Sequence, residues 1–205
     1  MAPEATGRPD ARGGPAAARG ASNRTVAHLV AAALKRHGVE FLIGQSAPTR
    51  LFLLGSEYGL TTIGIRTEKA GAMIADGYAR IAHKVPVVTS IAGPGAALLV
   101  PGLGEAFKAS IPIVAIVQDV PRSHTDKNPA QEFDHLDLFK PCAKLVRRVD
   151  RADRVEDYLD MAFAVASSGR PGPVVLMLPP DLFEDAAPPS DARVATLGRY
   201  PIDRT

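Results

Sequence analysis

Cysteine is nearly absent from this sequence of 205 residues, which contains only Cys142. A single cysteine allows neither an intrachain disulfide nor a cysteine zinc cluster, so we expect a protein of the reducing cytoplasm. No histidine lies near Cys142 in the sequence, and we therefore interpret this cysteine as a small buried hydrophobic residue and not as a nucleophile.

Long runs of one charge are also missing. The sequence has 24 basic and 22 acidic residues, and no run of five basic residues occurs, so we predict that nucleic acid is not a partner. The longest uncharged stretch, residues 85–104, contains three prolines and four glycines that would break a membrane-spanning helix. Because residues 1–22 also lack the apolar core of a signal peptide, we expect no association with a membrane.

The composition is that of a globular protein, with 46% hydrophobic and 22% charged residues. Residues 1–22 are mostly Ala, Gly, Pro and Arg, which cannot bury enough apolar surface to order a chain, and they predict a disordered extension. Residues 184–205 contain Ala-Ala-Pro-Pro-Ser-Asp and predict a linker-like tail. The sequence therefore predicts one domain, over residues 23–183.

Strand and helix patterns alternate within this domain. Ser22 or Asn23 can cap a first helix, which Gly38 ends. Continuous apolar strands joined by helices indicate a parallel sheet that is buried on both faces. We therefore expect an α/β fold, a three-layer α/β/α sandwich with a six-stranded parallel sheet. The strands are expected at residues 41–43, 61–65, 85–91, 113–117, 143–149 and 174–178, and further helices at residues 48–54, 67–83, 94–110, 134–139 and 153–167.

Ligands of such a sheet bind at the carboxyl ends of its strands. The turn at residues 92–95 follows a strand and opens a helix, but its spacing matches no phosphate-binding fingerprint. Glu68 lies in the first turn of a helix, where an acidic residue also stabilises the helix dipole. Asp76 and Arg80 are spaced as an ion pair on that helix. Glycines at positions 71 and 77 of the same helix predict that another part of the backbone packs closely there.

Other catalytic arrangements find little support. The acidic and histidine residues of segment 124–137 lack the spacing of a metal site, so we predict no metal ligands in this chain. Asp134 is instead interpreted as the cap of a short helix. A Ser/His/Asp triad is not supported, because no G-x-S-x-G motif occurs.

Five segments, taken in order, point to a known family. They resemble the N-terminal pyrimidine-binding domain of thiamine diphosphate-dependent enzymes, in the acetolactate synthase-like group, and the resemblance covers residues 25–183. The segments are Arg66-Thr67-Glu68-Lys69-Ala70 with Ala75-Asp76-Gly77-Tyr78-Ala79-Arg80, then Gly93-Pro94-Gly95, Gln131-Glu132 before Phe139-Lys140-Pro141, Ser168-Gly169-Arg170-Pro171-Gly172-Pro173-Val174, and Pro179-Pro180-Asp181.

The resemblance implies roles for individual residues. Glu68 would be the catalytic glutamate that hydrogen-bonds N1′ of the cofactor's aminopyrimidine and so activates thiamine diphosphate. Gly93 and Pro94 would pack on the pyrimidine ring, and Gln131 would approach the active centre from a polar loop. Of the first loop, Gln45 would lie near the cofactor and Ser46 near the substrate.

The sequence departs from the family pattern in three loops, which leaves the substrate open. The turn that typically reads Gly-Pro-Gly-Ala-Thr-Asn reads Gly-Pro-Gly-Ala-Ala-Leu at residues 93–98. The usual Phe-Gln-Glu is Ala-Gln-Glu at residues 130–132, and the usual Pro-Gly of the first loop is Gly44-Gln45. The resemblance therefore implies carboligation or decarboxylation of a 2-oxo acid, without choosing between them.

The diphosphate-binding half of such an enzyme is missing from this sequence. The family binds Mg²⁺ and the diphosphate through a Gly-Asp-Gly motif and a later Asn on another domain, and neither is found here. We therefore expect a diphosphate-binding domain or subunit as partner, in a homo- or hetero-oligomer. Two other interpretations stay open: a non-catalytic module of the same fold that serves dimerisation or regulation, and a flavodoxin-like domain that binds a nucleotide.

Overall fold

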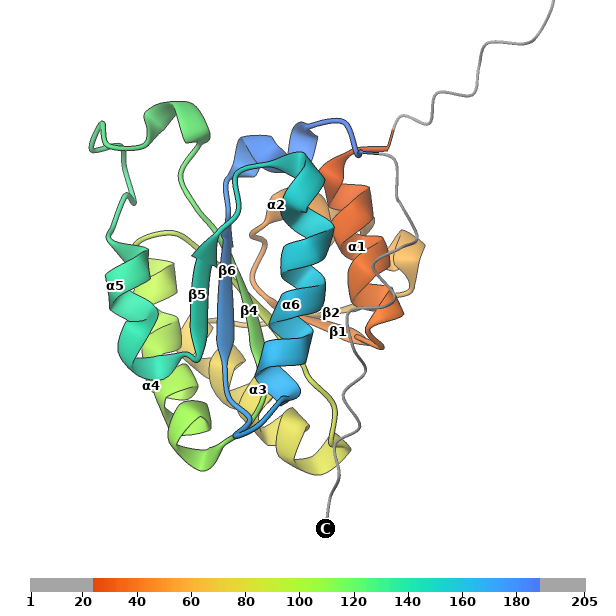
Figure 1. The fold of residues 1–205 in the computed structure, drawn as a ribbon, viewed down its shortest axis with the longest axis vertical. Coiled ribbons are helices and arrows are strands. Elements are labelled where there is room, and N and C mark those ends of the chain that lie inside the picture. Colours follow the sequence, from red (N-terminus) through yellow and green to blue (C-terminus); the bar gives the residue numbers. More distant parts are fainter. Residues whose placement is uncertain (1–23, 189–205) are drawn as a thin grey trace, which may run out of the picture.

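Six parallel strands form one sheet in the order β2-β1-β3-β4-β6-β5, in a computed structural model that describes residues 24–188 (Figure 1). Residues 1–22 and most of the predicted tail lie outside the described residues. All neighbouring strands pair in parallel, as the alternating pattern predicts. The strands are β1 (Phe41–Gly44), β2 (Thr61–Gly64), β3 (Val87–Ile91), β4 (Val114–Gln118), β5 (Leu145–Arg148) and β6 (Val174–Leu178).

Helices cover both faces of the sheet, which confirms the three-layer sandwich. One face carries α1 (Val26–Arg36), α2 (Thr49–Gly55) and α6 (Val155–Ser167), and the other carries α3 (Glu68–Ala82), α4 (Pro94–Ala109) and α5 (His135–Phe139). Val174 and Leu176 of β6 belong to the first hydrophobic core, whereas Val175 and Met177 belong to the second. Residues 24–188 also contain four 3-10 helices between these elements and a fifth after β6: η1 (Ser56–Tyr58), η2 (Arg122–His124), η3 (Lys140–Cys142), η4 (Ala152–Arg154) and η5 (Pro180–Glu184).

The ends of α1 test the capping predictions. The predicted cap was wrong: Thr25 is the N-cap, and its backbone N–H donates to Nδ1 of His28 at 3.1 Å, which closes the first turn. Gly38 follows the C-cap with a φ of 76°, a conformation that favours glycine, so the predicted helix end is confirmed. Asp134 caps α5 as predicted, since its Oδ1 accepts from the amide of Asp137 at 3.0 Å.

Helices α3 and α4 approach each other closely at Gly102. A Cβ at this position would lie 2.4 Å from the Cβ of Ala72, so only glycine fits. At Gly71 of α3, a Cβ would lie 2.6 Å from Cδ1 of Ile65, so the packing is tight, but the neighbours are side chains and not the backbone that was predicted. At Gly77 the prediction of close packing was wrong, because no atom lies within 4 Å of the Cβ position.

Two further predictions on single side chains are confirmed. Arg80 donates to Asp76 from Nε at 2.8 Å and from Nη2 at 3.1 Å, and this pair spans one turn of α3. Cys142 is 3% exposed, and its burial raises the pKa of the thiol to about 11. The thiol is therefore protonated at neutral pH, as expected for a packing residue.

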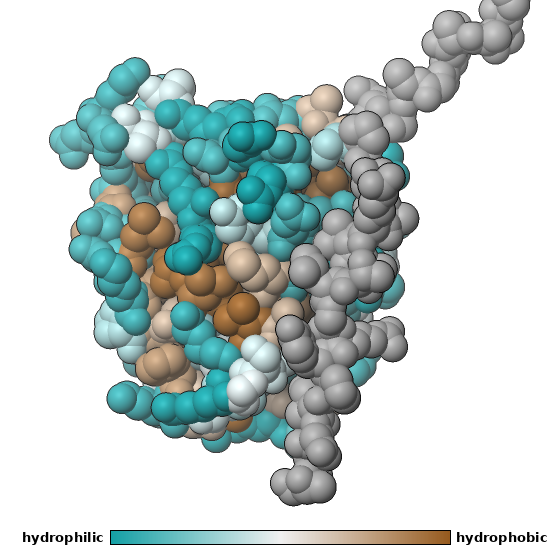
Figure 2. All heavy atoms as spheres, viewed as in Figure 1, coloured by the Kyte–Doolittle hydropathy of each residue, from teal (hydrophilic) through white to brown (hydrophobic). Residues whose placement is uncertain are grey.

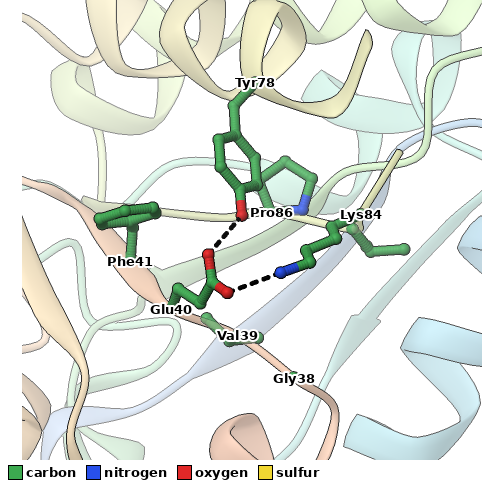
Figure 3. A pocket seen from close by; sticks show the side chains of 8 residues that line it. Gly38, Val39, Glu40, Phe41, Tyr78, Lys84 and Pro86 are labelled. Carbon is green, nitrogen blue, oxygen red and sulfur yellow. Dashed lines mark hydrogen bonds and ion pairs between the residues drawn. The ribbon is translucent and has the colours of Figure 1, made fainter. Parts of the chain in front are cut away.

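A small cluster of polar groups closes the amino ends of β1 and β3 (Figure 3). Glu40 accepts hydrogen bonds from the Tyr78 hydroxyl at 3.0 Å and from Nζ of Lys84 at 2.6 Å. The hydrogen bond from Lys84, and after it that from Tyr78, lowers the pKa of Glu40. The pKa of Tyr78 is raised, first by burial and then by its hydrogen bond to Glu40. An adjoining shallow hollow of about 360 Å³ is lined by Lys35, His37, Glu40 and Lys84 among others. Glu40 thus joins α3, through Tyr78, to the segment before β3, through Lys84.

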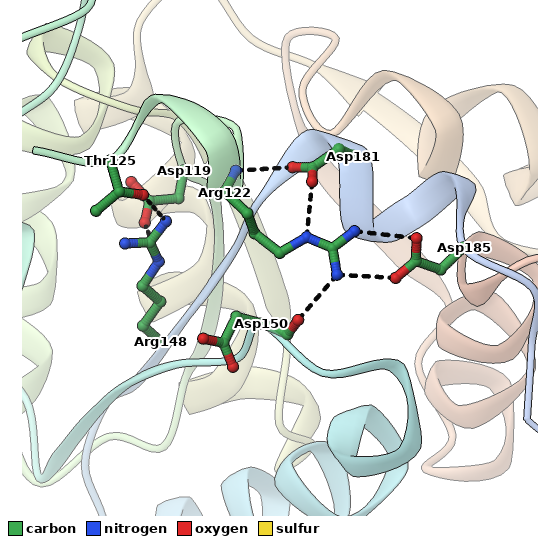
Figure 4. Close-up of polar contacts among 7 residues, drawn as sticks. All are labelled: Asp119, Arg122, Thr125, Arg148, Asp150, Asp181 and Asp185. Atoms are coloured by element: carbon green, nitrogen blue, oxygen red, sulfur yellow. Dashed lines mark hydrogen bonds and ion pairs between the residues drawn. The ribbon is translucent and has the colours of Figure 1, made fainter. Parts of the chain in front are cut away.

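Arg122 ties the segment after β6 to the segment after β4 (Figure 4). Its guanidinium donates to Asp185 through two nitrogens, at 2.9 and 3.0 Å, and its Nε donates to Asp181 at 2.6 Å. A third contact reaches the carbonyl of Asp150 at 3.0 Å. Burial alone would raise the pKa of Asp181, but the hydrogen bonds and charge of Arg122 outweigh it and lower that pKa.

Replacing Arg122 by methionine is expected to lower the free energy of unfolding at pH 7 by about 1 kcal/mol, since the ion pairs are partly exposed. The lowered pKa of Asp181 stabilises the fold above the pKa of the unfolded state, near 3.8, and this stabilisation is lost as the pH falls through the folded pKa. Urea unfolding at pH 7 and pH 3 should therefore show a smaller loss on acidification for the variant than for the wild type. Arg151→Met, which removes an exposed ion pair with Asp153, is the matched control; an equal effect of both variants would contradict the role of Arg122.

The two ends of the described chain lie side by side. Thr25 and Ala186 form an antiparallel bridge, in which the amide of Val26 donates to the carbonyl of Asp185 at 2.9 Å. The amide of Ala187 donates to the carbonyl of Arg24 at 2.8 Å. The first residues of the predicted tail thus lie against the start of α1.

Polar side chains cover much of the visible surface. Figure 2 shows apolar surface gathered around β5 and β6, between α5 and α6, with hydrophilic residues around it. β5 is an edge strand and pairs with β6 alone. Within residues 24–188, no helix has the length and apolar character needed to cross a membrane.

Candidate functional site

The carboxyl ends of β1 to β4 carry most of the residues that the sequence predicts for the site. Gln45 and Ser46 follow β1, Glu68 begins the helix after β2, and Gly93 and Pro94 follow β3. Parallel strands bring these ends to one edge of the sheet. Gln131 comes from the long loop after β4 and reaches the same edge.

Glu68 is a largely buried residue whose carboxylate has no partner within residues 24–188. The residue is 7% exposed, and no hydrogen bond or ion pair to its side chain is found among the described residues. Thr67, the N-cap of α3, accepts a hydrogen bond from the amide of Ala70 at 3.3 Å and leaves Glu68 in the first helical turn. A buried charge without partners is costly, so this carboxylate is suited to a donor that arrives from outside the chain.

Gly95 keeps the space in front of Glu68 open. A Cβ on Gly95 would lie 2.9 Å from Oε1 of Glu68 and 3.0 Å from Oγ of Ser90. A side chain at this position would therefore press on the carboxylate. Glu68 belongs to α3 and Gly95 to α4. The sequence placed both residues at the same edge of the sheet but did not predict this contact between them.

The turn at Gly93 requires glycine for two reasons. Its φ of 64° and ψ of −123° are rarely adopted by other residues. A Cβ would also lie 3.0 Å from the Cα and the carbonyl oxygen of Gln131. Gln131 itself has a φ of 73°, so two unusual backbone conformations pack against each other. Pro94 then begins α4 at a position that suits proline.

The first loop is tied to the second by a side chain. Nε2 of Gln45 donates to the carbonyl of Arg66 at 2.9 Å, just before Glu68. Gly44 packs so closely on Thr89 that a Cβ would lie 2.1 Å from its Oγ1. Ser46 is exposed, and no side-chain contact with the other site residues is found for it among the described residues.

Sequence reasoning missed three residues beneath the Gly93 turn. His135 accepts a hydrogen bond from the amide of Gly93 at 2.8 Å, and its other ring nitrogen lies 3.5 Å from Asp119. Arg148 lies 3.0 Å from the second oxygen of Asp119. The position of Asp119, directly after an apolar strand, was the one available signal. Within residues 24–188, no group of His, Cys, Asp and Glu is placed to hold a metal ion.

Comparison with known proteins gives consistent matches. A family model described as "Thiamine pyrophosphate enzyme, N-terminal TPP binding domain" matches residues 24–138. Acetolactate synthase of Arthrospira platensis is 36% identical over 183 residues, which make up 83% of this chain and 31% of that protein. The acetolactate synthase large subunit of Haemophilus influenzae is 35% identical over 158 residues, 76% of this chain and 28% of that protein. The chain thus spans less than a third of the length of these relatives.

A solved structure shares the fold. The thiamine diphosphate-dependent 4-hydroxybenzoylformate decarboxylase of Rhodococcus jostii RHA1 superposes with a TM-score of 0.78. The match covers 85% of this chain and 33% of that one, at 23% sequence identity. At this identity the likeness concerns the sandwich and its strand arrangement.

Proposed function

Because the chain belongs to the thiamine pyrophosphate enzyme family and carries its N-terminal TPP binding domain, we propose that it is the pyrimidine-binding half of an enzyme acting on 2-oxo acids. Thiamine pyrophosphate and thiamine diphosphate are the same cofactor. The names of the relatives, acetolactate synthases, support carboligation, and that of the structural neighbour supports decarboxylation.

One observation carries the proposal: Glu68 is only 7% exposed, its carboxylate has no partner among the described residues, and its Oε1 lies 2.9 Å from the Cβ position of Gly95. A ring nitrogen that carries a proton would satisfy this carboxylate and remove the cost of its burial. The residues present therefore fit the aminopyrimidine of thiamine diphosphate. A nicotinamide nucleotide could also use a carboxylate at this edge, for its ribose hydroxyls, but the turn at residues 92–95 lacks the spacing of a phosphate-binding fingerprint.

The neighbouring residues have supporting roles in this proposal. Gly93 and Pro94 would form the turn on which the pyrimidine ring packs, and Gln131 supports that turn, since its Cα and carbonyl oxygen lie 3.0 Å from the Cβ position of Gly93. Gln45 would contact the cofactor, and the exposed Ser46 would contact the substrate. When bound, thiamine diphosphate supplies the carbanion stabilisation that cleavage or formation of a bond to a 2-oxo carbon requires.

In this proposal a second domain or subunit supplies the remaining parts of the site. Mg²⁺ and the diphosphate would bind to this diphosphate-binding domain or subunit, in an oligomer, because the chain spans less than a third of the length of the acetolactate synthases that it matches. Such an assembly is a transferase or a lyase, according to whether it joins or splits carbon skeletons. The single cysteine suits a cytoplasmic enzyme.

The test is the consumption of 2-oxo acids by the chain assembled with a diphosphate-binding domain. Pyruvate and benzoylformate serve as substrates, with thiamine diphosphate and Mg²⁺ present, removed by dialysis, and added back. We expect turnover that disappears on removal and returns on addition. An assembly that binds thiamine diphosphate but consumes neither acid would favour a non-catalytic module for dimerisation or regulation.

A further inference from the structure

The amide of Gly93 has an unusual partner. An N-cap residue has no hydrogen-bond acceptor for its own amide within the helix, and this amide is buried beneath the turn. His135, at the start of α5, supplies the acceptor: its Nε2 lies 2.8 Å from the Gly93 nitrogen. The histidine is only 2% exposed, so water does not compete for this contact.

This contact determines which ring nitrogen of His135 carries the proton. An acceptor nitrogen has no hydrogen, so the neutral ring holds its proton on Nδ1. Nδ1 lies 3.5 Å from Oδ1 of Asp119, and the negative charge of that carboxylate favours a proton on this nitrogen. A carboxylate on the far nitrogen of a histidine is the general means by which proteins fix its tautomer and ring orientation.

Asp119 is held as an anion in turn. Burial would raise the pKa of Asp119, but the contact with His135, the amide of Val120 and the charge of Arg148 outweigh it and lower that pKa. Arg148 lies with Nε 3.0 Å from Oδ2 of Asp119, and its Nη2 donates to Oγ1 of Thr125 at 2.7 Å (Figure 4). Nε of Arg148 is buried and forms no hydrogen bond of good geometry among the described residues. Its ion pair with Asp119 is therefore the interaction that compensates for its burial.

We propose that His135 is a positioning residue, which holds the Gly93 turn against the cofactor through an acceptor nitrogen that Asp119 keeps free of its proton. The inference rests on the proposed function, because the turn bears on catalysis only if the pyrimidine packs on it. Gln131 fixes the turn from one side and His135 from below. Together they set the position of Gly95, and through it the space in front of Glu68.

Two amide variants of His135 separate positioning from packing. The Oε1 of glutamine reaches about as far as Nε2 of histidine, whereas the Oδ1 of asparagine reaches only as far as Nδ1. In the assembled enzyme we expect His135→Asn to raise the dissociation constant for thiamine diphosphate about tenfold and to lower kcat. His135→Gln should restore both to within about threefold of the wild type. Equal values for both variants would overturn the proposal.

A measurement without the cofactor covers the case in which a variant fails to fold. ¹⁵N NMR of the ring nitrogens in the 205-residue chain should show His135 as the neutral Nδ1-protonated tautomer, with a coupling between Nε2 and the Gly93 amide. The exposed His83 is the internal control. Asp119→Asn should shift the proton of His135 to Nε2 and break this coupling, because an amide can donate to Nδ1.

The two proposals fail in different ways. An Nε2-protonated or cationic His135 in the wild type overturns the positioning role, whatever the enzyme does. The expected tautomer in an assembly without cofactor-dependent turnover would instead overturn the proposed function, and with it the part of this inference that concerns the cofactor.

Discussion

Glu68→Gln is expected to lower kcat of the assembled enzyme by about 10²- to 10⁴-fold, the range in which a positioned acid–base group acts. Glutamine has nearly the same shape but no charge, so it cannot stabilise a protonated ring nitrogen as a carboxylate does. Because Glu68 is only 7% exposed, few water molecules can reach the carboxylate to replace the lost interaction. Steady-state kinetics with saturating thiamine diphosphate would measure the effect.

Stability gives the control for this variant. Because Glu68 has no protein partner among the described residues, removing its charge should leave the free energy of unfolding unchanged or raise it. Glu57→Gln, at an exposed position in η1, should affect neither kcat nor stability. Unchanged turnover in Glu68→Gln would show that the catalytic assignment is wrong, and a lower stability would indicate that the carboxylate serves the fold.

Gly102→Leu should cause the largest loss of stability. A Cβ at Gly102 would lie 2.4 Å from the Cβ of Ala72 and 3.1 Å from the amide nitrogen of Met73, and the second of these atoms belongs to the backbone of α3. The helices must therefore separate, and overpacking of this kind costs about 1–3 kcal/mol or more. We expect about 1–3 kcal/mol for Gly102→Ala and a larger loss for leucine, measured by urea unfolding.

Gly77→Ala is the matched control, because this glycine lies on α3 with no atom within 4 Å of its Cβ position. Alanine is the better helix former by about 0.8–1 kcal/mol, so this variant should be more stable than the wild type. A stable Gly102→Leu variant would mean that α3 and α4 can slide apart at little cost. In that case the position of Glu68, at the start of α3, would be less tightly fixed than the structure implies.

The sequence was sufficient to predict the order of the strands and helices, and it placed the candidate site residues at one end of the sheet. Strand and helix signals are local, so the strand predicted at residues 85–91, observed at residues 87–91, and the acidic first turn at Glu68 could be recognised without the fold. The structure confirms six parallel strands between two helical layers, with one hydrophobic core on each face of the sheet. Gly38 and Asp134 show that the signals that end and begin helices are equally local.

Contacts between distant segments could not be predicted in this way. Asp119, His135 and Arg148 come from three different segments, and only the strand order places them together. The spacing of these residues carries no periodic signal, and His135 was considered only as an unsupported metal ligand. Gly77 illustrates the reverse error, since a glycine inside a helix suggests close packing whether or not a neighbour is present.

The bridge between Thr25 and Ala186 holds the two ends of the described domain together at one point. Domains whose termini adjoin can be inserted into a loop of another protein, or circularly permuted, without a long connection. Force applied to the two ends would peel this short ladder one hydrogen bond at a time and would reach the sheet only afterwards.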